Sequence, residues 1–184
     1  MVTYFFEYLG GYYRWVRLGD WHSDKNITMF GDRTNWLDIN NYGYAVDSNS
    51  YILASMTSIA EFPTLVESVF LTKKLNREGI YAVRFFIRGK PWIVTVDDEV
   101  LLTSNQNNFM GIRSWQHRYA QLGDDNSAWG AILEKAWAKV KGSYRTSYDG
   151  GFMTNGIRAL VGSPVFTFPL NPWKDLMITE DLSW

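Results

Sequence analysis

Residues 128–140 carry the clearest periodicity in this 184-residue chain. Apolar side chains recur there at the i, i+3 and i+4 spacing of one helix face: Trp129, Ile132, Leu133, Ala136, Trp137 and Val140. Gly142 follows the last of them and favours a helix end, while Lys139 and Lys141 complement the negative end of the helix dipole. The segment therefore predicts a long amphipathic helix that must be packed against a core.

Two more helices are expected upstream. From residue 49 the apolar positions again follow helical spacing: Ile52, Leu53, Met56, Ile59 and Ala60. Ser48 or Asn49 is suited to cap the start of this helix, because short polar side chains bond the free N–H groups there. Pro63 ends it and fits the first position of a second helix, which we expect to run to about Leu75. The two helices should pack as a hairpin.

A β-hairpin is expected next. Residues 80–88 and 91–96 are rich in β-branched and aromatic side chains, and Gly89-Lys90 separates them. Asp97-Asp98 closes the second strand, and residues 103–108 are expected to form a polar loop. Helices with one short antiparallel hairpin or small sheet predict the α+β class.

The chain contains no repeat or linker, and we expect one lobe with an extension at each end. Residues 1–41 mix aromatic side chains with glycine turns and are expected to form an irregular arm. Residues 42–163 should form the folded lobe, and residues 164–184 an extended tail.

Charge and residue types exclude several functions. Eighteen basic and nineteen acidic residues give a net charge of -1, so no nucleic acid partner is expected. The sequence has no cysteine and two histidines, His22 and His117, so we expect no bound metal and no cofactor. No run approaches the ~20 apolar residues of a transmembrane span. Without a signal peptide the protein is expected to be intracellular; cytoplasm, cilium or cytoskeleton, and an organelle such as the mitochondrion are not distinguished.

Aromatic residues make up 17% of the chain, more than a core of this size needs. Because Trp and Tyr are enriched at protein interfaces, we expect contact with other protein subunits. The candidate interface residues lie in the two extensions: Tyr4, Phe5, Tyr8, Tyr12, Trp15, Trp173 and Trp184. An interfacial membrane helix over residues 4–15 is a weaker alternative, because Gly10-Gly11 interrupts it and few lysines are present.

The order of motifs is specific to one family. Residues 49–54 read Asn-Ser-Tyr-Ile-Leu-Ala, residues 96–98 Val-Asp-Asp, and residues 129–139 Trp-Gly-Ala-Ile-Leu-Glu-Lys-Ala-Trp-Ala-Lys. Gly142-Ser-Tyr and Gly150-Gly151 follow. Residues 49–162 resemble the first protease lobe of the papain-like calpain family, with its Asp-Cys-Trp-Leu-Leu-Ala helix start, its Val-Asp-Asp and its Trp-Ser-Ala-Leu-Leu-Glu-Lys-Ala-Tyr-Ala-Lys helix. The resemblance implies the fold of that lobe.

The resemblance places Ser50 at the position of the catalytic cysteine. A papain-type thiol ionises at a helix N-terminus beside an imidazolium, whereas a hydroxyl has a pKa far too high for that and needs a strong general base. The family's oxyanion-hole glutamine falls on Tyr44 without a gap, or on Asn41 if a short insertion is placed. Neither residue is glutamine, so we expect a degenerate nucleophile position and a degenerate oxyanion position.

Other family features are also altered. The resemblance implies a catalytic histidine and asparagine in a second lobe, and the 22 residues after Gly162 are too few to form one. Neither His22 nor His117 matches the family's histidine. The family's calcium-binding acids correspond to Asn41 and Ser127, which are neutral. Asp124 and Asp125 lie near the second position, and we expect them to form a solvated acidic loop.

These differences predict a catalytically inactive calpain-like domain that acts as a structural or accessory subunit of a larger assembly. A cysteine-to-serine mutant of an active protease would also carry Ser50, but it would keep the glutamine and the second lobe. Two alternatives stay open: a hydrolase completed by residues of another chain, and a peptide-binding module that uses the remnant cleft.

Overall fold

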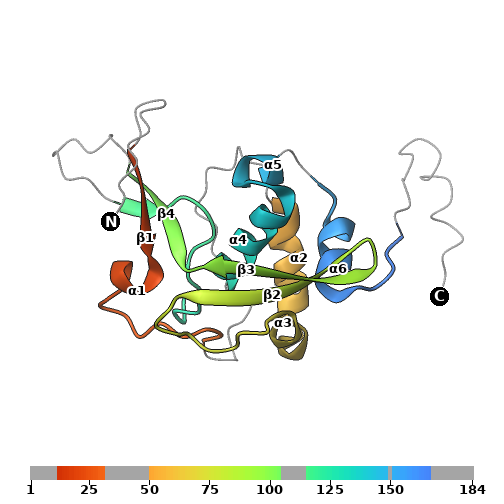
Figure 1. Ribbon diagram of the computed structural model, residues 1–184, viewed down its shortest axis with the longest axis horizontal. Coiled ribbons are helices and arrows are strands. Elements are labelled where there is room, and N and C mark those ends of the chain that lie inside the picture. Colours follow the sequence, from red (N-terminus) through yellow and green to blue (C-terminus); the bar gives the residue numbers. More distant parts are fainter. Residues whose placement is uncertain (1–11, 32–49, 105–114, 149–150, 167–184) are drawn as a thin grey trace, which may run out of the picture.

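The computed structural model describes residues 12–31, 50–104, 115–148 and 151–166. Runs of helices and runs of antiparallel strands are separate along the chain, so the α+β class is confirmed. In Figure 1, α1 and β1 lie at one end of the molecule and α6 at the other, with the hairpin of β2 and β3 running between them. The described residues include no helix long and apolar enough to cross a membrane.

The strongly periodic segments form helices as predicted. They are α2 (Ser50–Ala60) and α4 (Trp129–Lys141), and α4 ends at Gly142, whose φ of 97° is one that glycine adopts freely. A later helix, α6 (Met153–Val161), is followed by Gly162 in the same left-handed region. Two short helices, α1 (Leu18–Trp21) and α5 (Tyr144–Tyr148), follow β1 and α4.

The second predicted helix is shorter than expected. It begins at Pro63, as the sequence indicates, but α3 spans only Pro63–Val69 and does not reach Leu75. Phe70 instead forms an isolated bridge with Val83, and the amide of Leu71 donates to the carbonyl of Ala82 at 2.9 Å. These long-range bonds to a strand replace the next helical turn. Contacts between α2 and α3 confirm that the two helices pack together.

The predicted β-hairpin is confirmed. Strands β2 (Ile80–Ile87) and β3 (Lys90–Asp97) pair antiparallel, with Ile87 opposite Lys90 across a two-residue turn. The turn residues Arg88 and Gly89 have φ values of 53° and 77°, which match the right-handed twist of the strands. The hairpin packs on α6 through β2 and on α4 through β3.

A three-stranded sheet lies beside the hairpin, and it was not predicted from the sequence. It contains β1 (Tyr12–Arg17), β4 (Glu99–Ser104) and β5 (Trp115–His117) in the order β1-β4-β5. The described part of the expected irregular arm is therefore partly a strand, and Tyr12 and Trp15 are not helical as the membrane alternative required. Thr103 and Ser104, expected in a loop, end β4. The division at residue 41 stays a prediction, since residues 32–49 lie outside the described residues.

One apolar core joins the helices to the hairpin. Its largest side chains with less than 2% exposure come from α2, α4, α6 and β2, together with Phe70: Trp129, Tyr81, Phe70, Phe85, Ile52, Met56, Ile132, Leu133 and Leu160. Every apolar position predicted for residues 49–60 is buried. The core thereby fixes α2 and the residue at its head.

Candidate functional site

Ser50 is the first residue of α2, and its side chain is exposed. The resemblance placed the nucleophile at a helix start, and the structure puts Ser50 there. Tyr44 and Asn41, the two alternatives for the oxyanion position, lie outside the described residues, as do Ser48 and Asn49. The described half of the candidate site is therefore α2 and the elements that hold it.

Tyr51, the next residue, is buried against α4. Its hydroxyl accepts a hydrogen bond of 2.8 Å from the indole Nε1 of Trp137, and both side chains are less than 9% exposed. The ring of Tyr51 also lies so close to Gly151 that a Cβ atom there would come within 2.8 Å of it. Relative to the calpain pattern quoted above, the aromatic types are exchanged, because that pattern has Trp after the nucleophile and Tyr on the long helix.

Ser55 joins α2 to α6. Its hydroxyl has two backbone carbonyls within hydrogen-bond distance, that of Tyr51 at 2.7 Å and that of Met153 at 3.0 Å. Gly156 of α6 packs directly on Ser55, and a Cβ atom at Gly156 would lie 2.2 Å from the serine Oγ. A larger residue at position 156 would force the two helices apart. The start of α2 is thus fixed by close contacts with both α4 and α6.

The two histidines lie away from α2. His22, just after α1, and His117, at the end of β5, face each other with their Nε2 atoms 2.9 Å apart. His117 Nδ1 lies 3.3 Å from the carbonyl of Ala120, which can only accept a hydrogen bond. We therefore assign the Nδ1–H tautomer to His117, so that its Nε2 accepts the proton of His22 Nε2. No contact within the described residues joins either imidazole to Ser50.

Burial keeps both imidazoles neutral. It is the main cause that lowers the pKa of His22 to about 4, and His117 and Lys25 lower it further while Asp24 opposes them. The pKa of His117 is also lowered, mainly by burial, although the bond to Ala120 opposes this. A neutral imidazole can act as a base, but here both Nε2 atoms are occupied with each other. The pair accordingly forms a structural contact between α1 and β5.

The second position implied for calcium, Ser127, is buried at the start of the turn into α4. Its amide donates to Asp125 Oδ1 at 3.0 Å. The other oxygen, Asp125 Oδ2, is buried without a hydrogen-bond partner among the described atoms, which corrects the expectation of a solvated loop at this residue. Gly31 leaves room for that carboxylate, since a Cβ atom there would lie 1.8 Å from it.

The donor set around Ser127 does not fit a calcium ion. Calcium takes six to eight oxygen ligands, several of them carboxylates. Across the described residues, no three His, Asp or Glu side chains come together in a way that would hold a metal. Asn41 lies outside the described residues, so the loss of the family's calcium site stays a prediction.

Of the predicted interface residues, Trp15 is the one whose side chain the structure describes. It is 37% exposed, and its ring lies 6.4 Å from that of Tyr144 and 4.9 Å from Lys135 Nζ. Part of it is therefore already used within the chain. Tyr12 lies in β1, while Tyr4, Phe5, Tyr8, Trp173 and Trp184 lie outside the described residues.

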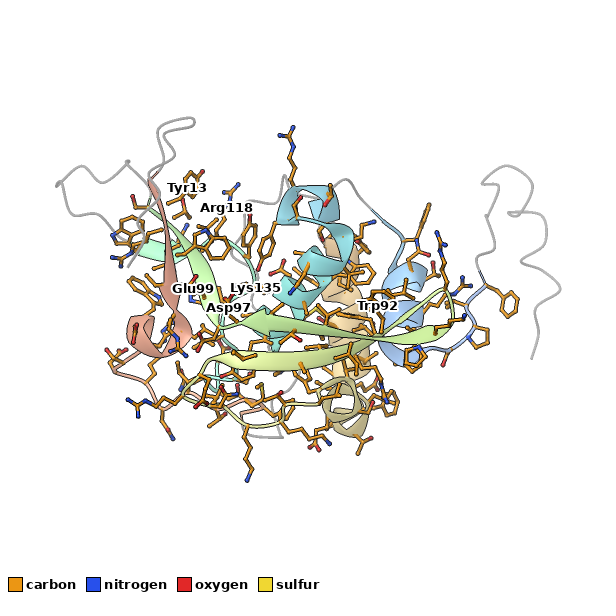
Figure 2. The ribbon with its side chains drawn as sticks, in the orientation of Figure 1. Tyr13, Trp92, Asp97, Glu99, Arg118 and Lys135 are labelled. Atoms are coloured by element: carbon orange, nitrogen blue, oxygen red, sulfur yellow. The ribbon has the colours of Figure 1, made fainter. Side chains whose placement is uncertain are left out.

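A more exposed apolar pair was missed. Trp92 and Ile93 of β3 are each 60% exposed, although adjacent strand residues point to opposite faces. Figure 2 places Trp92 toward one end of β3, whereas Asp97, Glu99 and Lys135 lie together at the other end. A sequence signal existed, since two large apolar residues directly follow the Lys90-Pro91 pair of a hairpin, where one polar residue would be expected.

Comparison with known sequences points to one family. The family model described as "Calpain family cysteine protease" matches residues 8–182. Among curated proteins, the calpain-type cysteine protease DEK1 of Zea mays is 31% identical over 152 residues, which is 80% of this chain and 6% of that protein. ADL1 of Oryza sativa, also a calpain-type cysteine protease, is 33% identical over 112 residues. Calpain-B of Drosophila melanogaster is 28% identical over 142 residues, covering 76% of this chain and 14% of its own length.

The match covers only a small part of each relative. The chain spans 5% of ADL1 and similarly small shares of the other two, so it corresponds to a fragment of their protease region. The matched residues nevertheless include the described elements from β1 to α6. Residues 12–31 lie before the first of the motifs quoted from the sequence. The family match shows that they belong to the same homologous region.

Proposed function

The chain belongs to the calpain family of cysteine proteases, and we propose that it is a catalytically inactive member that acts as a structural or accessory subunit of a larger intracellular protein assembly. The observation that carries the proposal is Ser50 at the head of α2 in a sequence without cysteine. A helix N-terminus lowers the pKa of a thiol into the physiological range but leaves a hydroxyl protonated.

The environment of Ser50 supports the same conclusion. A serine nucleophile needs a base within about 2.6–3.2 Å of its hydroxyl. The only two histidines of the sequence are hydrogen-bonded to each other between α1 and β5. Within the described residues Ser50 therefore has no imidazole, and a serine-type hydrolase would need one from outside this sequence.

The surroundings of α2 argue for retained structure. Tyr51, Ser55 and Gly156 still make close contacts with neighbouring helices. A scaffold role needs this fold, whereas it does not need the nucleophile. Loss of the thiol with retention of the packing is the pattern expected for a domain kept for its shape and surface.

A protease assay with two variants tests the proposal. Purified protein, with and without calcium, is incubated with casein and with a fluorogenic peptide, beside Ser50→Cys and Ser50→Ala. We expect no hydrolysis above the buffer rate from any of the three, since the thiol alone lacks its base. Hydrolysis that Ser50→Ala abolishes would overturn the proposal and favour the hydrolase completed by another chain.

The assembly part of the proposal has its own test. The protein is purified from its native source under mild conditions, and its mass is measured by native mass spectrometry. We expect a defined complex in which this chain is present in whole-number stoichiometry. A stable monomer would contradict the subunit role, and a monomer that carries a co-purified peptide would favour the peptide-binding alternative.

A further inference from the structure

The two edges of the β2–β3 hairpin are treated differently. The outer edge of β2 is covered by the segment after α3, through the bond from Leu71 to Ala82 and the bridge between Phe70 and Val83. Strand β3 pairs with β2 alone among the described strands. Among the described residues, the hairpin is a two-stranded sheet that is closed on one side and open on the other.

The register identifies which backbone groups face outward. Ile87 and Lys90 flank a two-residue turn, so they form a hydrogen-bonded pair, and the pairs then alternate along the strands. Ile93 and Thr95 of β3 belong to the pairs that are not hydrogen-bonded to β2. Their backbone N–H and C=O groups therefore point away from β2. Two observations agree with this direction. The Thr95 carbonyl accepts a bond of 2.6 Å from Lys139 Nζ, and Pro91, which has no N–H, stands at an outward position.

A groove runs along this edge. Two hollows of about 490 and 470 Å³ adjoin at Thr95 and Lys139, between β3 and the C-terminal half of α4. The first is mainly apolar and is lined by Ile87, Trp92, Ile93, Val94 and Val140 together with the two shared residues. Trp92 and Ile93 are each 60% exposed, and they lie on a strand whose outward backbone groups can form hydrogen bonds. The edge therefore offers an apolar surface and backbone hydrogen-bonding groups, which together make a strand-docking site.

The charge of the groove selects the partner. Lys139 is the one ionisable side chain that lines the first hollow. In the second, Asp97 already bonds Lys135, whose Nζ also donates to the carbonyl of Glu99 at 2.5 Å. Within the part of the chain that the structure describes, the unneutralised charge of the groove is thus the ammonium of Lys139, which occupies the place of an incoming N–H donor. A carboxylate on an added strand would draw Lys139 away from Thr95 and release that carbonyl.

We propose that the free edge of β3 is a docking site for an extended segment of a partner protein, which adds as a third strand with apolar side chains at alternate positions and a carboxylate opposite Lys139. This inference rests on the proposed function only in requiring a partner, and it names the surface that the partner uses. The added strand bonds Ile93 and Thr95 and covers Trp92.

The opposing explanation is that Pro91 and Lys139 only prevent association. Lysine and proline on an edge strand are common protections against pairing with other chains. That explanation leaves Trp92 and Ile93 unaccounted for, and it makes a different prediction. If Lys139 only protects the edge, Lys139→Ala increases self-association of the protein and confers no preference for acidic peptides.

Fluorescence anisotropy with defined peptides tests the docking site on the full chain. The probes are short fluorescein-labelled peptides that alternate Val with Thr. The Asp peptide has one Asp at its centre, and the Lys peptide has Lys at that position. The N-methyl peptide is the Asp peptide with N-methyl groups on alternate amides. We expect saturable binding of the Asp peptide, and at least about tenfold weaker binding of the Lys and N-methyl peptides, which corresponds to about 1.4 kcal/mol.

Charge reversal on the protein complements the charge reversal on the peptide. Lys139→Glu should weaken the Asp peptide at least about tenfold and strengthen the Lys peptide, while Lys141→Glu, which reverses an exposed charge at the same helix end, should change neither more than about twofold. Ile93→Pro, which removes an outward N–H, should weaken the Asp peptide as N-methylation does. No saturable binding of the Asp peptide, or equal binding by all variants, would overturn the docking site.

The outcomes separate this inference from the proposed function. Absence of peptide binding with no hydrolysis leaves the inactive-subunit proposal standing and removes only this surface. Hydrolysis dependent on Ser50 overturns the subunit proposal without changing the peptide titrations. Oligomers formed by Lys139→Ala but not by the unchanged protein would support edge protection and count against docking.

Discussion

The α2–α4 junction and the junction around β1 hold the chain by different means. At the first, Tyr51 and Trp137 are buried, and the uncharged hydrogen bond between them joins the two helices. At the second, charged and titratable groups make the contacts. Arg17 donates to both carboxylate oxygens of Asp98 at 2.8 and 3.0 Å, and His22 bonds His117. The first junction should depend on volume, and the second on pH and salt.

This difference separates the part of the fold that positions Ser50 from the part that attaches residues 12–31. The buried junction lies beside Ser50 and keeps the framework of a protease site whose chemistry we propose to be lost. The polar junction attaches residues 12–31 to the rest of the fold through β4 and β5. Four substitutions or conditions test whether the two regions differ as described, in order of decreasing effect.

The largest effect is expected in the apolar core, at the start of α4. Trp129 is 1% exposed, and Trp129→Ala should lower the free energy of unfolding by about 3–5 kcal/mol, because it removes a large apolar side chain and leaves a cavity. Urea unfolding followed by circular dichroism measures it. Trp92→Ala is the matched control, since that ring is 60% exposed, and it should change stability by about 0.5 kcal/mol or less. Equal losses would contradict the description of the core.

Tyr51→Phe is expected to cost about 1–3 kcal/mol, because it leaves the buried indole N–H of Trp137 without its acceptor. Ser58→Ala on the exposed face of the same helix is the control and should cost little. The double variant Tyr51→Phe with Trp137→Phe removes both polar groups. It should be less destabilised than the sum of the two single variants, and additive losses would show that the bond itself contributes nothing.

The polar junction should weaken on acidification. The folded-state pKa of His22 is lowered to about 4 from 6.5, so the unfolded chain binds more protons between these values. Stability is therefore fully present above about pH 6.5 and falls as the pH drops toward 4. Because His22 is only half-buried, we expect a loss of about 1 kcal/mol between pH 7 and pH 5. Urea unfolding across this range measures the slope.

His22→Gln supplies the control for the acid effect. Glutamine keeps a donor for His117 but does not titrate, so the slope between pH 7 and pH 5 should become smaller. Lys25 and Asp24 are unchanged in this variant, which holds the neighbouring charges constant. A variant with an unaltered slope would assign the acid sensitivity to His117, whose pKa is also lowered by burial, or to titratable groups elsewhere.

The smallest effect is expected at the exposed ion pair of Asp97 with Lys135. The carboxylate is 56% exposed, so Asp97→Asn should cost no more than about 1 kcal/mol. Burial raises the pKa of Asp97, but the hydrogen bonds from Lys135 and from the Glu99 amide outweigh it, and the pKa is lowered from 3.8. Its contribution is thus present above that value and is lost as the pH falls further. Measurement in high salt should remove most of the difference between the variant and the unchanged protein.

Local periodicity was sufficient for the elements that carry the core. The apolar spacing of α2 and α4, the glycine after α4 and the Arg88-Gly89 turn are encoded within short windows, and each was predicted close to its observed position. Strand β1 was missed because it is defined by pairing with β4, from Tyr12 opposite Ser104 to Arg17 opposite Glu99. The length of α3 was overestimated for the same reason, because Phe70 pairs with Val83 of β2 and does not continue its helix.

The candidate site was predictable in position but not in surroundings. Motif order placed Ser50 at a helix start, and the structure agrees. The meeting of His22 with His117 across 95 positions of sequence carries no local signal, because no spacing rule links a residue after α1 to one in β5. The close approach of Gly31 to the Asp125 carboxylate is likewise long-range, which is why a solvated loop was expected there.

The hydrogen bond between Trp137 and Tyr51 also makes the two single exchanges at this pair unequal. A pair of tyrosines keeps a donor and an acceptor, whereas two indoles present two donors and no acceptor in a buried space. Tyr51→Trp alone should therefore fold poorly, while Trp137→Tyr alone should keep the hydrogen bond between the two helices.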